Sequence, residues 1–194
     1  MTKIKICGLM NLDDIKAINQ AKPDLAGFIF AGGRHHLDLA QALKMRQALD
    51  PSIKSVGVFV NAPVTEMVEA VESGAVSLIQ LHGQESEDTV KQLQAKNIPV
   101  INVFKPDTIN LNTAADYIMI DSGSGNGQLI DWQKLKITTK KPLIIAGALD
   151  INNLHDAINA IHPDFVDISR GVESAGQKNS EKILQIVPKA HALY

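Results

Sequence analysis

The sequence predicts an α/β protein of the (β/α)8 (TIM) barrel class, folded as a single domain over residues 1–194. Eight short apolar runs alternate along the chain with amphipathic, helix-like stretches. The middles of these runs are β-branched or aliphatic, as expected for parallel strands that are buried on both faces. No linker, low-complexity segment or long charge run divides the chain, and its length suits one barrel.

Eight strands are expected, each ending at a polar or glycine-containing loop. In chain order they are Lys3–Cys7, Leu25–Phe30, Ser55–Val60, Leu78–His82, Val100–Phe104, Tyr117–Asp121, Pro142–Ala146 and Phe165–Ser169. Helices are expected where apolar residues recur at i, i+3, i+4 and i+7, because this spacing places one apolar stripe on one helix face. Three such stripes are Val64, Met67, Val68 and Val71; Leu154, Ala157, Ile158 and Ile161; and Ile183, Ile186, Val187 and Ala190.

Polar residues and glycine mark the expected helix ends. Side chains of Asn, Ser and Asp can accept hydrogen bonds from the free N–H groups of a first helical turn. The candidate N-caps are Asn11, Ser86 and Asp150, and the candidate helix stops are Gly74 and Asn97. A further helix is expected over 131–139, between the sixth and seventh strands.

An open, doubly wound sheet is the alternative that the same alternation allows. That fold usually places a glycine-rich phosphate loop after its first strand. Here only Cys7-Gly8-Leu9-Met10 follows, without a G-x-G-x-x-G or Walker pattern. The closed barrel is therefore the favoured prediction.

Composition narrows the expected partners and compartment. A formal net charge of −2 gives no general attraction to nucleic acid or to an anionic membrane. The single cysteine cannot form an internal disulfide, which fits a reducing compartment. No apolar leader precedes the first strand, and no run is long enough to span a bilayer. We expect a cytoplasmic protein that acts on a small molecule, as a monomer or a homodimer.

In a closed barrel the C-terminal ends of all strands converge on one mouth, where substrates bind. The residues expected there combine a thiol, a carboxylate, basic groups and glycine-containing loops. In chain order they are Cys7, the loop Ala31–His36, Asn61, His82, Lys105, Asp121, Gly147 and Ser169.

Cys7 and Asp121 are the expected catalytic pair. Cys7 ends the first strand, where a thiolate could take a proton; the alternative is a small hydrophobe packed at a strand end. Asp121 ends an apolar strand, and desolvation raises the pKa of a carboxyl, which would let it donate a proton. Considered alone, Asp121 could instead cap the turn that follows it. One base and one acid on opposite sides of a small substrate are what an isomerase needs.

Two loops predict a phosphate site. Gly147 and Ala148 follow the seventh strand, and Ser169, Arg170 and Gly171 follow the eighth. Phosphate-binding barrels often hold the anion with backbone N–H groups of these two loops, and glycine lets the backbone approach closely. The alternative is a pair of ordinary turns.

Arg34, His35 and His36 form a cationic cluster after the second strand. A guanidinium suits a carboxylate, although a solvated loop is the alternative. The six histidines form no convincing metal set, so neither a metal nor a cofactor is expected. Loops that could close over a substrate are marked by Gly8, Gly32, Gly33, Gly123, Gly125 and Gly127.

Segments along nearly the whole chain resemble, in the same order, the phosphoribosylanthranilate isomerase family of tryptophan biosynthesis. Each segment is short, and the ordered set is specific. They are Lys5–Leu9, Gly27–Phe30, Val56–Asn61, Ile79–Gly83, Ile120–Asp121, Gly125–Trp132, Ala146–Leu149 and Val166–Glu173.

The resemblance implies a (β/α)8 fold and a cofactor-free Amadori rearrangement of N-(5-phosphoribosyl)anthranilate to 1-(2-carboxyphenylamino)-1-deoxyribulose 5-phosphate. The family's general base falls on Cys7 and its general acid on Asp121, in agreement with the roles argued from the residues. The family's arginine that faces the anthranilate carboxylate falls on Arg34 by residue type, which we favour, or on His35 by counting back along the loop. His82 is expected near the substrate without a chemical role.

This chain departs from the family pattern in its phosphate loops. Ala148 stands where a second glycine is common, and Arg170 stands where a small residue is usual. A related aminoaldose isomerase of histidine biosynthesis is an alternative, but that family pairs two aspartates and lacks a thiol at the position of Cys7. A non-catalytic phosphosugar-binding barrel is the alternative from another class of protein.

Overall fold

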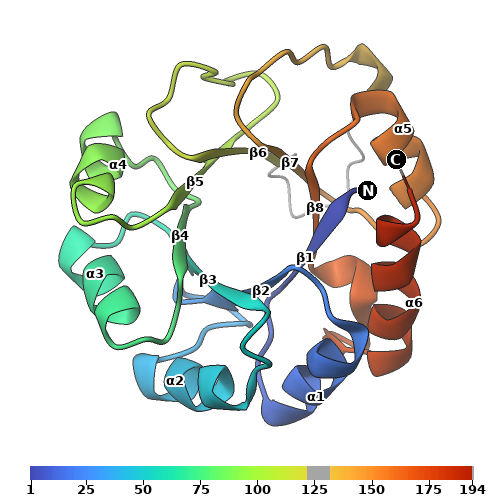
Figure 1. Ribbon diagram of the computed structural model, residues 1–194, viewed down its shortest axis with the longest axis horizontal. Helices are drawn as coiled ribbons and strands as arrows, with labels where there is room; N and C mark the ends of the chain where they lie inside the picture. The colour runs from blue at the N-terminus through green and yellow to red at the C-terminus, as the bar shows by residue number, and fades with distance from the viewer. Residues whose placement is uncertain (122–131, 194) are drawn as a thin grey trace.

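Eight parallel strands close into a barrel in the order β1 to β8, and the helices lie around its outside (Figure 1). The structure is a computed structural model that describes residues 1–121 and 132–193. The strands are β1 (Lys3–Cys7), β2 (Leu25–Ile29), β3 (Lys54–Phe59), β4 (Leu78–Leu81), β5 (Val100–Phe104), β6 (Tyr117–Asp121), β7 (Leu143–Ala146) and β8 (Phe165–Ile168). Because β8 pairs with β1, the predicted closed barrel is confirmed and the open sheet is excluded.

Six α-helices cover the barrel over the residues that the structure describes. They are α1 (Leu12–Ala21), α2 (Leu39–Ala48), α3 (Val64–Glu72), α4 (Glu87–Gln94), α5 (Leu154–Ile161) and α6 (Ser180–His191). The three predicted apolar stripes lie on α3, α5 and α6. Asn11 and Ser86 cap α1 and α4 as predicted, each through its side-chain oxygen. Gly74 and Asn97 adopt positive φ just beyond α3 and α4, as expected of helix stops.

The predicted N-cap at Asp150 is wrong by three residues. Asn153 is the residue that precedes α5. Asp150 Oδ1 instead accepts from the backbone N–H groups of Asn152 and Asn153, so this carboxylate closes the turn before the helix. An aspartate that bonds the backbone two residues on is typical of such turns, and sequence alone does not separate the two uses.

The predicted helix over 131–139 is also wrong in its described part, since only a 3-10 turn, η1 (Trp132–Lys134), forms there. The β-branched run Ile137-Thr138-Thr139 disfavours helix. No helix separates β5 from β6 either, because residues 105–116 contain Pro106, Asn110 and Asn112, which favour turns. The rim glycines Gly123, Gly125 and Gly127, and residues 125–131 of the family-like segment, lie outside the described residues.

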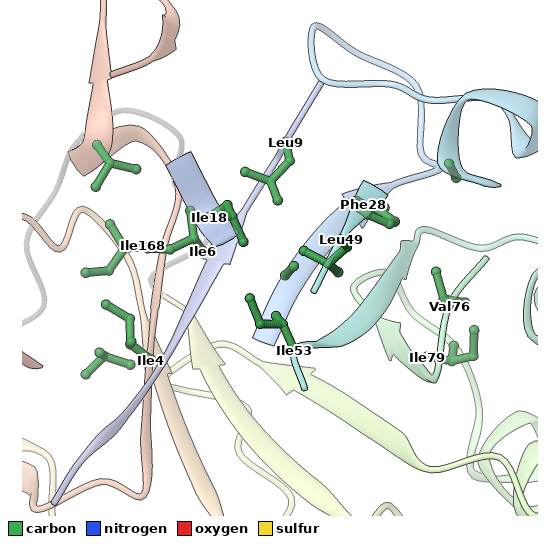
Figure 2. Close-up of a cluster of buried hydrophobic side chains, with 14 of the residues drawn as sticks. Ile4, Ile6, Leu9, Ile18, Phe28, Leu49, Ile53, Val76, Ile79 and Ile168 are labelled. Atoms are coloured by element: carbon green, nitrogen blue, oxygen red, sulfur yellow. The ribbon is translucent and has the colours of Figure 1, made fainter. Parts of the chain in front are cut away.

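Alternation along β1 determines which side chains enter the barrel. Figure 2 shows Ile4 and Ile6 packed outward with Ile168 of β8 and with Leu9 and Ile18 of the first βα unit. Successive strand residues point to opposite faces, so Lys5 and Cys7 face the barrel interior. A separate apolar cluster fills that interior with Leu25, Val56, Leu78, Ile101, Met119, Ile144, Ala146 and Phe165. Cys7 therefore stands above a packed core, at the C-terminal mouth.

Candidate active site

Cys7 lies at the C-terminal end of β1 with 5% of its surface exposed. Its register partner on β2 is Gly27. A Cβ atom on Gly27 would stand 2.7 Å from Cys7 Sγ, closer than a real contact allows. The sulfur of Cys7 therefore occupies space that is open only because residue 27 is glycine.

Opposing electrostatic effects act on the Cys7 thiol. Burial is the largest, and it raises the pKa of Cys7 above the ordinary thiol value. The charge of Lys5 opposes this rise most strongly, and Lys178 adds a smaller effect of the same sign. The carboxylate of Asp167 acts with burial. Cys7 is consequently a protonated thiol in the free protein, and the charges of Lys5 and Lys178 partly stabilise its thiolate form.

Asp121 ends β6 with 21% of its side chain exposed, and it contacts the histidine that follows β4. His82 Nε2 lies 3.4 Å from Asp121 Oδ2. On its other side, His82 Nδ1 lies 2.8 Å from the amide nitrogen of Gln80. If that amide donates to Nδ1, the neutral imidazole carries its proton on Nε2, which faces the carboxyl group. His82 is thus a close neighbour of the Asp121 carboxyl group, a relation that the sequence did not indicate.

Asp121 and His82 line a cavity of about 540 Å³ at the C-terminal mouth. Asn102 and Lys105 of the β5 segment also contribute to its lining, so Lys105 lies at the rim as expected. Cys7 is not among the described residues that line this cavity; it ends β1, beyond β7 and β8 from Asp121 around the barrel. The thiol and the carboxyl therefore come from different sides of one mouth.

The two predicted phosphate loops touch each other. Gly147 and Ala148 have φ of +109° and +50°, so the chain turns sharply after β7. After β8, Ser169 precedes the 3-10 turn η2 (Arg170–Val172). A Cβ on Gly171 would overlap the carbonyl oxygen of Leu149, so glycine is what allows this close approach.

Ser169 connects the second loop to a lysine of a neighbouring hairpin. Its hydroxyl and carbonyl oxygens accept hydrogen bonds from Lys178 Nζ at 3.3 and 3.0 Å. Lys178 belongs to a small antiparallel hairpin of β9 (Glu173–Ser174) and β10 (Gln177–Lys178). The ammonium group of Lys178 is buried, and its charge acts on Cys7, His35 and Glu173.

Glu173 is the centre of an ion-pair cluster that the sequence did not predict. Its carboxylate accepts from Arg34 Nη2 at 2.6 Å and from Lys178 Nζ at 2.8 Å, and it lies 2.9 Å from His35 Nε2. Burial opposes ionisation, but Lys178 and the other cations hold the pKa of Glu173 below its ordinary value. The sequence indicates Glu173 only as the last residue of a family-like segment. Its partner Arg34 lies 139 residues away, and a contact at that separation leaves no local sequence pattern.

The two candidates for the carboxylate-binding cation differ in environment. Arg34 is 54% exposed, whereas His35 is largely buried beside Gly8. Burial, followed by the charge of Lys178, lowers the pKa of His35. Because a guanidinium stays charged and a buried imidazole does not, the electrostatics favour Arg34. His36 lies apart from this cluster, with Nδ1 3.1 Å from the Phe30 carbonyl oxygen.

Among residues 1–121 and 132–193, no group of three or more His, Cys, Asp or Glu side chains is placed to hold a metal ion. None of the helices in the same ranges has the length and apolarity needed to cross a membrane.

Comparisons with known proteins agree along the whole chain. The family model described as N-(5'phosphoribosyl)anthranilate (PRA) isomerase matches residues 4–189. N-(5'-phosphoribosyl)anthranilate isomerase of Lacticaseibacillus casei (strain BL23) is 45% identical over 190 residues, which are 98% of this chain and 95% of the relative.

Two solved structures show the same likeness in three dimensions. TrpF from Jonesia denitrificans superposes with a TM-score of 0.89 at 31% identity, covering 100% of this chain and 98% of that one. A phosphoribosyl anthranilate isomerase in complex with reduced 1-(o-carboxyphenylamino)-1-deoxyribulose 5-phosphate superposes with a TM-score of 0.83 at 26% identity, covering both chains completely.

Proposed function

The chain belongs to the N-(5'-phosphoribosyl)anthranilate isomerase family, and from that premise we propose that Cys7 and Asp121 are its general base and general acid. The enzyme converts N-(5-phosphoribosyl)anthranilate to 1-(2-carboxyphenylamino)-1-deoxyribulose 5-phosphate, an aldose–ketose isomerisation of tryptophan biosynthesis. The assignment of roles is carried by one observation: a buried thiol on β1 and a half-buried carboxyl on β6 end at the same mouth.

In the proposed reaction Asp121 and Cys7 each transfer one proton, and a tautomerisation transfers a third. Asp121 donates a proton to the furanose ring oxygen; the bond from that oxygen to C1 breaks, and the anthranilate nitrogen forms an iminium with C1. The Cys7 thiolate then removes the proton on C2, which the adjacent cation acidifies, to give an enolamine. Tautomerisation of the enolamine then adds a proton at C1 while the C2 hydroxyl group loses its proton, which leaves the ketone at C2. Proton exchange with solvent returns Asp121 to its acid form and Cys7 to the thiolate. Each acid–base contribution is worth on the order of 10²–10⁴ in rate.

Binding at the two ends of the substrate completes the proposal. Gly147, Ala148, Ser169, Arg170 and Gly171 are proposed to hold the phosphate, and the contact between their two loops supports this. Arg34 is proposed to bind the anthranilate carboxylate in exchange for Glu173, because both anions suit the same guanidinium. His82 is proposed to contact the substrate beside Asp121. We also propose that the reaction takes place in the cytoplasm.

An assay of the purified protein on two substrates tests the function. We expect turnover of N-(5-phosphoribosyl)anthranilate. The aminoaldose of histidine biosynthesis serves as the comparison, because its isomerase is the related alternative. Turnover of the histidine-pathway compound alone would contradict the proposal, and turnover of neither would favour a phosphosugar-binding protein without catalysis.

Replacing Gly171 by alanine is expected to raise KM about tenfold or more while kcat changes by less than about threefold. The added methyl group would collide with the Leu149 carbonyl and push the two phosphate loops apart, which removes binding that ground state and transition state share. Steady-state kinetics measure both constants. Gly74→Ala, just beyond α3, is the control: a Cβ there meets no atom within 4 Å, and its positive φ of +82° places the cost on stability rather than on KM. An unchanged KM in a folded Gly171→Ala variant would remove the phosphate assignment.

The profile of kcat/KM against pH is expected to be bell-shaped. The reactive form has an ionised thiol and a protonated carboxyl, so it carries one proton between the pair; acid adds a second proton and alkali removes the last. Because burial raises the pKa of Cys7, the alkaline limb should lie above the ordinary thiol value of about 8.5. A profile that is flat from acid to alkaline pH, or a limb below that value, would argue against a buried thiol base.

A further inference from the structure

A buried ion pair lies inside the barrel directly beneath the thiol. The side chain of Lys5 is completely buried, and its Nζ lies 2.9 Å from Asp167 Oδ1. The two residues are register partners on β1 and β8. Burial alone would lower the pKa of Lys5, but the charge of Asp167, together with the Cys7 sulfur and hydrogen bonding to both residues, outweighs it, and the pKa is raised. A cation is thus held permanently in a low-dielectric interior.

Packing does not require this pair. The apolar cluster of the interior extends from Leu25 on β2 to Phe165 on β8, and Gln80 on β4 shows that a buried polar side chain there need not be charged. A buried ion pair is weak evidence for stability, since well-packed apolar residues of similar volume often replace one without loss. The proposed proton transfers also leave both residues without a task.

The placement of Lys5 relates it to Cys7. Both residues point into the barrel from β1, two positions apart, so Cys7 stands one layer nearer the mouth. The charge of Lys5 and its hydrogen bonding both act on the sulfur, whereas Asp167 binds Lys5 from the neighbouring strand. We propose that Lys5, fixed by Asp167, is a positioning residue that stabilises the thiolate form of Cys7 from inside the barrel. This inference rests on the proposed role of Cys7 as the base.

Other charged groups face the same sulfur and set the size of the effect. From β8, Asp167 opposes ionisation of the thiol, and from β10, Lys178 favours it. From β2, the neighbour is Gly27, which carries no charge. Asp121 and His82 stand at the mouth on β6 and at the end of β4. Lys5 exerts the strongest of the charge effects on Cys7, so removing its charge should change the ionisation of the thiol more than removing either of the other charges.

The test is a direct titration of the thiol in Lys5→Met, followed by the ultraviolet absorbance of the thiolate. The chain has one cysteine, and the same titration of Cys7→Ala supplies the background from its two tyrosines, so the difference signal comes from Cys7 alone. We expect the titration midpoint to rise by about one pH unit or more, which means about tenfold less thiolate at a pH below both midpoints. The plateau of kcat/KM should fall about three- to tenfold, because the less acidic thiol gives a stronger base that recovers part of the loss.

A second variant keeps the test decisive if Lys5→Met fails to fold around an unpaired Asp167. The double variant Lys5→Met/Asp167→Leu removes both charges and makes this layer apolar. Its midpoint should also rise, though less than in Lys5→Met, because the opposing carboxylate is lost as well. Lys5→Arg, which keeps the charge, should lie closer to the wild-type midpoint than Lys5→Met does.

The outcomes separate this inference from the proposed function. A folded variant without Lys5 whose midpoint stays within about 0.3 of wild type would overturn the inference and show a merely structural pair. A raised midpoint with unchanged kcat and kcat/KM would support the action of Lys5 on the thiol but show that Cys7 is not the base.

Discussion

Replacing Cys7 by alanine is expected to lower kcat at least about a hundredfold, because the proton on C2 then has no base within reach. The effect should fall on kcat more than on KM, since the thiolate acts on the reacting carbon rather than on the phosphate or the aromatic ring. Single-turnover and steady-state assays at the pH optimum measure the loss. The melting temperature should fall by no more than a few degrees, because the substitution removes a single buried atom.

Cys7→Ser controls for the shape of the side chain. Serine keeps the size of the group but replaces a thiol by an alcohol that does not ionise in the relevant range, so kcat should fall to a similar extent. Full activity in either variant would show that Cys7 is a packing residue at a strand end, which is the structural alternative for a buried cysteine.

Replacing Asp121 by asparagine is expected to lower kcat at least about a hundredfold as well. The amide has nearly the same shape and keeps a contact with His82, but it cannot donate an acidic proton to the ring oxygen. The measurement is kcat for N-(5-phosphoribosyl)anthranilate in a variant whose folding is verified by circular dichroism.

Asp107→Asn is the matched control for this loss. Asp107 is an exposed carboxylate in the loop after β5, and the same change of charge there should leave kcat within about twofold. An Asp121→Asn variant as active as Asp107→Asn would mean that ring opening needs no acid from β6.

The ends of the strands were predicted to within a residue or two, because a strand that is buried on both faces has a continuous apolar sequence. A strand of a closed parallel barrel is covered by helices outside and by side chains inside, so runs such as Val100–Phe104 are apolar almost throughout. The helices α3, α5 and α6 were equally clear, because each presents one stripe to the barrel. The ends of the strands then placed Cys7 and Asp121 at one mouth without further information.

Interactions between distant segments could not be predicted in the same way. Arg34 pairs with Glu173, and Lys5 pairs with Asp167. These pairs depend on loop conformation and on strand register, which the spacing of apolar residues along the chain does not reveal. Lys5 could have been noticed, since it shares an inward face with Cys7 and a lysine there demands a partner. The contact of His82 with Asp121 joins two strand ends on either side of β5, and it depends on side-chain positions that no local pattern records.

The measurement that tests the account most directly is a crystal structure of this enzyme with reduced 1-(o-carboxyphenylamino)-1-deoxyribulose 5-phosphate. We predict that Cys7 Sγ contacts C2 of the sugar chain, and that a carboxylate oxygen of Asp121 approaches the C4 hydroxyl, which is the ring oxygen before opening. The phosphate should lie between the loops of Gly147 and Gly171. A complex in which C2 faces away from Cys7, or in which the sugar lies beyond reach of Asp121, would contradict the account.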